Sequence, residues 1–216
     1  MLFKNTYKEI IKDSVGYYKE KGSRFIGYCY IVKTEQEVKK KIEIIKKKEK
    51  SANHYCFAYL LNYDKSICKF SDDGEPSYTA GKPILNQIKS HDLTNILIIV
   101  VRYFGGTKLG IPGLIRSYKN TTINAINNTE IVTKNIQEEY ELFFKYSYLE
   151  GVMKQIKKWE LVILENNFNL DCRIKILVSK KKSDIVFDFF KNHKNIKNRM
   201  KNLIVRLANG IGNQLF

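Results

Sequence analysis

Residues 93–113 read LTNILIIVVRYFGGTKLGIPG, an apolar run that ends in a glycine-rich turn. A near-continuous apolar run is typical of a strand buried on both faces, so residues 93–103 are predicted to be a central strand. Pro112 suits the first position of a helix, and the apolar spacing after it predicts a helix to about Asn127. A buried strand, a tight turn and a helix therefore organise the centre of the chain.

The sequence before this region predicts further strands and two helices. Aromatic and β-branched side chains predict strands at residues 25–32, 54–61 and 66–70, the last two as a hairpin. Thr34 and Glu37 form a capping-box pattern that predicts the start of a helix. A short helix is predicted around Pro83, with Thr79 as its N-cap.

The sequence after it predicts a second domain. Residues 133–139 are polar and are predicted to be a linker. The elements predicted beyond it are strand 140–146, helix 149–158, strands 161–165 and 169–178, helix 183–192 and strand 196–205. Asn166 and Asn167 are predicted to form the turn between the middle strands. This order is typical of a ferredoxin-like βαββαβ module.

The fold class is therefore predicted to be α+β, with domains at residues 1–135 and 139–207. The tail at 208–216 has no clear period and stays unassigned.

The composition indicates a basic globular protein. Of 216 residues, 44% are hydrophobic and 12% aromatic, which argues against disorder. No apolar run is long enough to cross a bilayer and no signal-peptide pattern is present, so we expect a cytoplasmic protein with no membrane partner. The four cysteines show no CxxC spacing and are expected to be reduced.

The net charge favours a polyanionic partner. There are 38 Lys and Arg against 22 Asp and Glu, a formal charge of +16, which attracts RNA, DNA or another polyanion. Only six of these cations are arginines, and a lysine-rich chain with many Ile and Asn residues is also what an AT-rich genome produces. A polyanionic partner and the composition of an AT-rich genome both stay open as explanations of the charge.

The glycine-rich turn is the first candidate site. Glycines let a ligand approach the backbone, and a helix N-terminus binds anions through its unpaired N–H groups. The residues predicted to bind the anion are Arg102, Gly105, Gly106, Lys108, Gly113 and Arg116. The alternative is a structural turn whose arginines pair internally with Asp72, Asp73 or Glu75. The turn matches neither the Walker A motif nor the dinucleotide fingerprint.

Two further groups of residues have weaker patterns. Asp72, Asp73 and Glu75 provide oxygen ligands suited to Mg²⁺ but lack the spacing of a Ca²⁺ loop, so turn and ion-pair roles are the alternative. Gly81 and Lys82, at the start of the next helix, are a second predicted anion contact.

His54 and Cys56 are expected to face the same side of one strand and are too few for zinc. Core packing is the expected role of Cys56, and no cofactor is expected.

Several blocks of the sequence resemble the YigZ/IMPACT family. They are SRFIG at 23–27, ANHYCFAY at 52–59, DDGEPS at 72–77 and the run from Gly81 to Gly110. The resemblance covers roughly residues 15–127, and Arg24 in its first block joins the candidate anion-binding residues. Tyr78 and Pro112 depart from the family pattern at positions where glycine is usual.

The resemblance implies a fold and a link to translation. It implies an N-terminal domain like the second domain of small-subunit ribosomal protein five, and a whole chain like two neighbouring domains of elongation factor G. Eukaryotic members are linked to translational control. For a two-domain bacterial form, only a general link to translation or RNA transfers, and the resemblance implies no catalytic residue.

These observations lead to three functional hypotheses. The first is a regulatory protein that binds RNA or the ribosome through phosphate contacts at the glycine-rich turn, with a protein partner as a further candidate. The second is a metal-assisted enzyme acting on a phosphorylated small molecule or nucleic acid, in which the carboxylates hold the metal and Arg102 clamps phosphate. The third is a protein-interaction module using an uncharged face of the C-terminal sheet. We favour binding over catalysis, and the oligomeric state stays open.

Overall fold

The computed structural model describes residues 5–192 and 196–200. The chain forms two compact units: a first unit, Thr6–Lys134, and a second unit that holds Asn5 and the described residues from Asn135 onward. Both units combine helices with antiparallel strands, so the α+β class is confirmed. The predicted domain ends at residues 1 and 207 lie outside the described residues.

A five-stranded antiparallel sheet forms the centre of the first unit, in the order β2-β3-β6-β4-β5. Its strands are β2 (Ser14–Glu20), β3 (Ser23–Ile31), β4 (His54–Leu61), β5 (Ile67–Ser71) and β6 (Ile96–Tyr103). β6 lies in the middle of the sheet and is buried from Ile96 to Arg102. The predicted central strand and the predicted hairpin of β4 and β5 are both confirmed.

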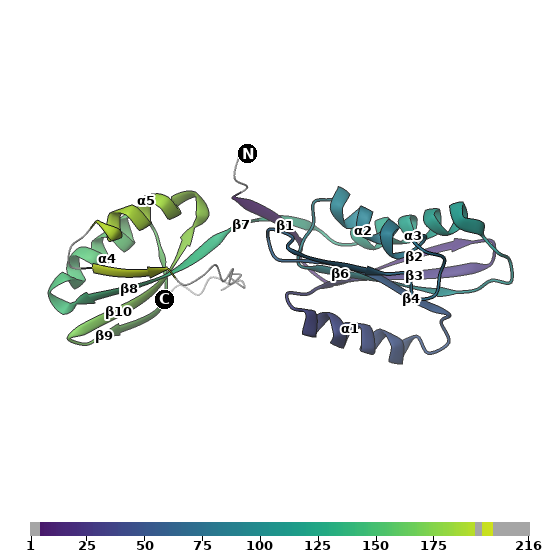
Figure 1. The fold of residues 1–216 in the computed structure, drawn as a ribbon, viewed down its shortest axis with the longest axis horizontal. Helices are drawn as coiled ribbons and strands as arrows, with labels where there is room; N and C mark the ends of the chain where they lie inside the picture. The colour runs from purple at the N-terminus through teal and green to yellow at the C-terminus, as the bar shows by residue number, and fades with distance from the viewer. Residues whose placement is uncertain (1–4, 193–195, 201–216) are drawn as a thin grey trace. The chain divides into compact units, whose positions relative to one another are not determined.

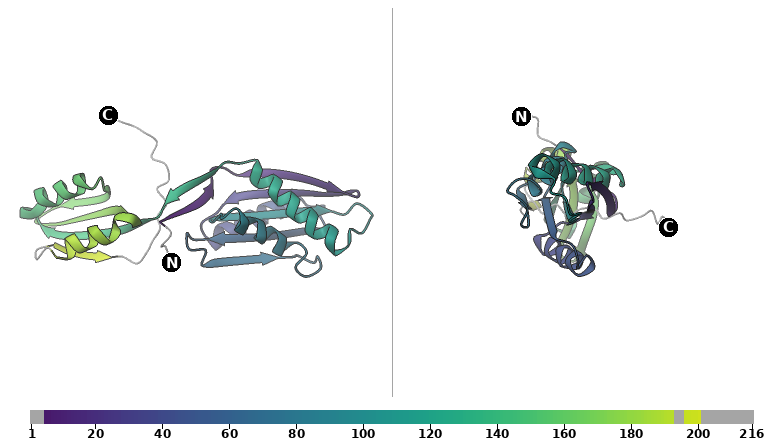
Figure 2. Two further views of the ribbon diagram at one scale, coloured as in Figure 1. Left: turned by 90° about the horizontal axis from the view of Figure 1, so that it is seen from above. Right: turned by 90° about the vertical axis from the view of Figure 1, so that its right-hand side faces the viewer.

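Helices cover both faces of this sheet (Figure 1). α1 (Glu35–Lys48) packs on one face, and α2 (Gly81–Ser90) and α3 (Gly110–Asn127) lie side by side on the other (Figure 2). Successive residues of β6 alternate between the two resulting clusters, because neighbouring side chains of a strand point to opposite faces. This is why the sequence of β6 is apolar at every position before Arg102.

The helix starts differ in part from their predicted form. Thr34 caps α1 as predicted, since its Oγ1 accepts the N–H of Glu37 at 3.2 Å. Thr79 does not cap α2, because its hydroxyl donates to the carbonyl of Pro76 at 2.6 Å. α3 begins two residues before Pro112 and has no side-chain cap.

Three strands were not predicted, because about half of their positions are polar. They are β2, β1 (Thr6–Ile10) and β7 (Ile131–Asn135), and the last two pair in a two-stranded sheet. Within β1, Glu9 is buried and pairs with Lys134 at 2.7 Å. The predicted linker at 133–139 contains the boundary between the two units, but most of its residues belong to β7 and to the following strand.

The second unit has a four-stranded antiparallel sheet in the order β11-β8-β10-β9, with two helices. Its elements are β8 (Gln137–Lys145), a short 3-10 turn (Tyr146–Tyr148), α4 (Leu149–Lys158), β9 (Val162–Phe168), β10 (Asp171–Ser179), α5 (Lys180–Lys191) and β11 (Ile196–Met200). The order of strands and helices is the βαββαβ order that was predicted.

The turn between the middle strands was placed wrongly. Asn166 and Asn167 lie inside β9, where Asn167 pairs with Arg173, and the chain reverses at residues 169–170. β9 is an edge strand with mostly exposed side chains, so polar residues are tolerated there. The last predicted strand extends past residue 200, and this part and the tail at 208–216 lie outside the described residues. No helix in the described part of the chain is long and apolar enough to span a membrane.

Candidate functional site

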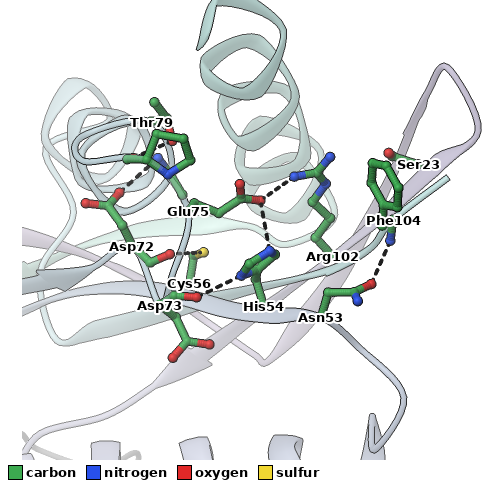
Figure 3. A network of polar contacts seen from close by, with 12 residues as sticks. Ser23, Asn53, His54, Cys56, Asp72, Asp73, Glu75, Thr79, Arg102 and Phe104 are labelled. Atoms are coloured by element: carbon green, nitrogen blue, oxygen red, sulfur yellow. Dashed lines mark hydrogen bonds and ion pairs between the residues drawn. The ribbon is translucent and has the colours of Figure 1, made fainter. Parts of the chain in front are cut away.

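The turn between β6 and α3 is fixed by side chains from neighbouring parts of the sheet (Figure 3). Asn53 Oδ1 accepts the N–H of Phe104 at 2.8 Å, and Ser23 Oγ accepts the N–H of Gly105 at 3.2 Å. Sequence reasoning missed both roles, although Asn53 and Ser23 lie in the blocks that resemble the family. Asn53 and Ser23 lie far from residues 104 and 105 in the sequence, so no local pattern predicts that they contact this turn.

The glycines of the turn have different roles. A Cβ on Gly105 would come within 1.9 Å of the Gly22 backbone, and one on Gly113 within 2.9 Å of the Leu109 Cβ, so these two glycines allow close packing. Gly106, with φ +85°, has open space around it. Of the three glycines of this turn that were predicted to contact an anion, Gly106 alone is placed to let a ligand reach the backbone.

The N-terminus of α3 is open to a ligand. No side chain caps it and its first turn holds no acidic residue. Lys108 and Gly110 are exposed beside it, and no ion pair of the described residues involves Lys108. A helix start in this state presents free N–H groups and a partial positive charge.

The two other predicted arginines lie near the turn in different surroundings. Arg116 is exposed and bonds Glu20, and this hydrogen bond holds the pKa of the Glu20 carboxyl below its usual value. Arg24 lies on β3, with its guanidinium 4.8 Å from the centre of the Tyr103 ring. Tyr103 ends β6, which places Arg24 beside the turn. Glu20 ends β2 two residues before Gly22, which packs against Gly105 of the turn, so Arg116 is also close to it.

Arg102 does not reach the open surface, which corrects its predicted role as a phosphate clamp. It is 6% exposed, and its Nη1 donates to Glu75 Oε1 at 2.7 Å. The rings of Phe25 and Phe104 each lie 5.6 Å from its guanidinium carbon. The same Glu75 oxygen accepts the hydroxyl of Tyr118 at 2.8 Å. Arg102 therefore has the internal ion pair that stood as the alternative.

The acidic loop is also occupied by internal hydrogen bonds. Asp72 Oδ1 accepts the N–H groups of Ala80 and Gly81 at 3.0 and 2.8 Å, so Asp72 caps α2. Asp73 Oδ2 accepts the N–H of Tyr55 at 2.7 Å. Among residues 5–192, no group of His, Cys, Asp or Glu is placed to hold a metal ion.

At the second predicted anion contact, Gly81 is occupied by an internal hydrogen bond and Lys82 is exposed. The N–H of Gly81 is taken by Asp72, and Lys82 lies 5.8 Å from the centre of the Phe70 ring. The start of α2 therefore carries a carboxylate, whereas the start of α3 carries a lysine.

Cys56 and His54 support the core and the acidic loop. The Cys56 thiol is fully buried, 3.0 Å from the Asp72 carbonyl, and burial raises its pKa far above the usual range. His54 Nδ1 lies 2.8 Å from the carbonyl of Asp73, and its Nε2 is 4.0 Å from Glu75 Oε1. A thiol with a raised pKa is a poor nucleophile.

One face of the second unit's sheet carries ion pairs that involve buried residues. Lys175 pairs with Glu165 at 2.7 Å and with Glu139 at 3.6 Å, and Arg173 pairs with Glu141. The uncharged exposed face expected of a protein-interaction module stays a prediction, because Lys175, Glu139 and Glu141 are buried.

Comparison with known proteins places the chain in a family. Residues 21–126, which include the whole turn, match the Impact N-terminal domain, so the first unit is a domain of this class. The chain is 32% identical over 179 residues to IMPACT family member YvyE of Bacillus subtilis (strain 168), covering 83% of this chain and 82% of that protein. It is 31% identical over 150 residues to IMPACT family member YigZ of Escherichia coli (strain K12), covering 68% and 74%.

The chain belongs to the IMPACT family. A solved structure described as the crystal structure of an hypothetical protein is also similar, with a TM-score of 0.69 and 25% identity. It covers 92% of this chain and 98% of that chain.

Proposed function

We propose that this protein is a translation-linked regulatory protein whose first unit binds the phosphate backbone of RNA, free or in the ribosome. The contact surface is the turn between β6 and α3. The observation that carries the proposal is the exposed, uncapped N-terminus of α3 beside Lys108. An anion at such a helix start gains about 0.3–1 kcal/mol before any side chain contributes.

The charge of the chain supports this proposal. A formal charge of +16 attracts a polyanion at long range. Arg116 lies six residues after the start of α3, and helical side chains lean toward the helix N-terminus. Lys108 therefore places positive charge beside the free N–H groups, and Arg116 adds a second cation that is paired with Glu20.

The link to translation rests on the family. The sequence resemblance connects its eukaryotic members with translational control, and the chain belongs to that family. A catalytic function is less well supported, because Asp72, Asp73 and Glu75 are all used in internal hydrogen bonds.

Filter binding with a structured RNA hairpin tests the proposal. Binding should weaken steeply between about 50 mM and about 200 mM salt, because phosphate contacts release counterions. Lys108→Glu should weaken binding at low salt and reduce the slope of log K against log salt by about one.

Lys119→Glu is the matched control, since Lys119 is exposed on the same helix away from its start. The proposal fails if the unchanged protein does not bind at low salt, or if Lys108→Glu and Lys119→Glu bind equally well.

A further inference from the structure

A strip of aromatic and basic side chains lies on the α1 face of the first unit's sheet. We define it as Tyr17, Lys19, Arg24 and Tyr103. Lys19 pairs with Arg24 and Arg24 with Tyr103 across three neighbouring strands, and Tyr17 is two residues from Lys19 on the same face. The ends of β2 and β3 extend beyond α1 (Figure 1), so this part of the face is not covered by the helix.

Tyr17 is the most unusual member of the strip. It is 65% exposed on an edge strand, opposite Ile26. Among residues 5–192, no hydrogen bond or ring contact holds its side chain. Tyr103 differs, because its hydroxyl donates to Glu49 at 2.5 Å and Arg24 lies over its ring.

We propose that Tyr17 stacks on an unpaired base of RNA while Lys19 and Arg24 contact the adjoining phosphates. Exposed aromatic rings beside a basic groove are the shared features of sites for single-stranded nucleic acid, because every base has a face that can stack. In a duplex these faces are hidden inside the helix, so this strip selects single-stranded segments. The inference rests on the proposed RNA-binding function and names the form of RNA.

The position of the strip fits one continuous path for the RNA. Gly22, in the turn that joins β2 to β3, packs directly against Gly105. The strip and the turn before α3 therefore lie at the same end of the sheet. A strand whose phosphates contact Lys108 can continue onto Tyr17.

One carboxylate borders the strip and is already compensated. Glu49 follows α1 and accepts the hydroxyls of Tyr103 and Tyr28. These hydrogen bonds, with Lys48 and Arg24 nearby, offset the effect of burial and lower its pKa. Glu49 therefore stays ionised and offsets part of the charge of Arg24, while Lys48 is a second cation beside it.

The test compares a fluorescent single-stranded RNA of about twelve nucleotides with its duplex form. Tyr17→Ala should weaken binding of the single strand by about tenfold and leave the duplex unchanged. For Tyr17→Ala, the slope of log K against log salt should equal that of the unchanged protein, since no phosphate contact is lost. Tyr17→Phe keeps the ring and should bind the single strand like the unchanged protein.

Tyr146→Ala is the matched control, because Tyr146 is a 57% exposed tyrosine of the second unit. The inference is overturned if Tyr17→Ala and Tyr146→Ala bind the single strand equally well, or if Tyr17→Ala weakens duplex binding to the same extent. If Lys108→Glu still weakens binding in that case, the proposed function stands without the strip. If the unchanged protein binds neither RNA, the proposed function fails first.

Discussion

Loss of the ion pair between Arg102 and Glu75 is expected to destabilise the first unit instead of removing RNA binding. Arg102→Met keeps an apolar stem of similar length but leaves the Glu75 carboxylate, 8% exposed, without its cation. The hydroxyl of Tyr118 would remain as its hydrogen-bond donor. Breaking one side of a buried ion pair costs about 3–5 kcal/mol. A whole domain is stable by only about 5–15 kcal/mol, so this loss is large.

A double-mutant cycle isolates the pair itself. Glu75→Gln alone leaves Arg102 charged and buried between two aromatic rings. The double variant removes both charges, so its free energy of unfolding should fall by less than the sum of the single losses. We expect a coupling of about 2 kcal/mol, within the range found for contacting residues.

Urea unfolding followed by far-UV circular dichroism measures these changes. With a slope of about 1–3 kcal/mol per molar urea, a loss of about 4 kcal/mol moves the midpoint by about 1–4 M. Trp159, the chain's single tryptophan, packs against Phe189 and Phe190 in the second unit. Its fluorescence therefore reports the second unit and separates a local loss from unfolding of the whole chain.

One result would refute the reasoning about this pair. If Arg102→Met changes the free energy of unfolding by less than about 1 kcal/mol but abolishes RNA binding, Arg102 acts on a ligand. The sequence-based role of Arg102 as a phosphate contact would then be restored.

Two further predictions concern thiols and acid stability. Of the four cysteines, only Cys68 is exposed, and burial raises the pKa of Cys29 to about 12. Ellman's reagent should therefore titrate one thiol in the native protein and four in urea. Cys68→Ser should remove the fast reaction of the native protein. The hydrogen bonds from two tyrosines help to hold the pKa of Glu49 below its usual 4.5. The ionised Glu49 carboxylate therefore stabilises the folded state above pH 4.5, and this stabilisation is lost as the pH falls through the lowered pKa of Glu49. In acid unfolding, the free energy of unfolding of Glu49→Gln should depend less on pH in this range than that of the unchanged protein. An equal pH dependence would contradict this role of Glu49.

The parts of the fold that could be predicted have strong local patterns. The apolar run of β6, the capping pair Thr34 and Glu37, and the bounds of α4 all follow from spacing along the chain. β1 and β2 were missed because each exposes part of its length and includes charged residues such as Lys19. Asn166 and Asn167 were taken for a turn because an exposed edge strand tolerates residues that are typical of turns.

The candidate site was predicted only in part, because its contacts join distant segments. The sequence left open whether the arginines near the turn bind a ligand or pair internally, and it offered three carboxylates as partners. The choice of Glu75 for Arg102 depends on how the acidic loop folds over β4 and β6, which no local pattern encodes. The role of Asp72 as the cap of α2 is likewise decided by residues eight and nine positions further along.

The pairing of β1 with β7 brings the first and last strands of the first unit together. A unit whose two ends are neighbours can be joined end to end by a short link and opened at an exposed loop elsewhere. Circular permutation is therefore compatible with this fold, and the order of its strands along the gene is not a requirement of its architecture. The same proximity lets such a unit be inserted into, or removed from, a longer chain in the course of evolution without separating the flanking segments.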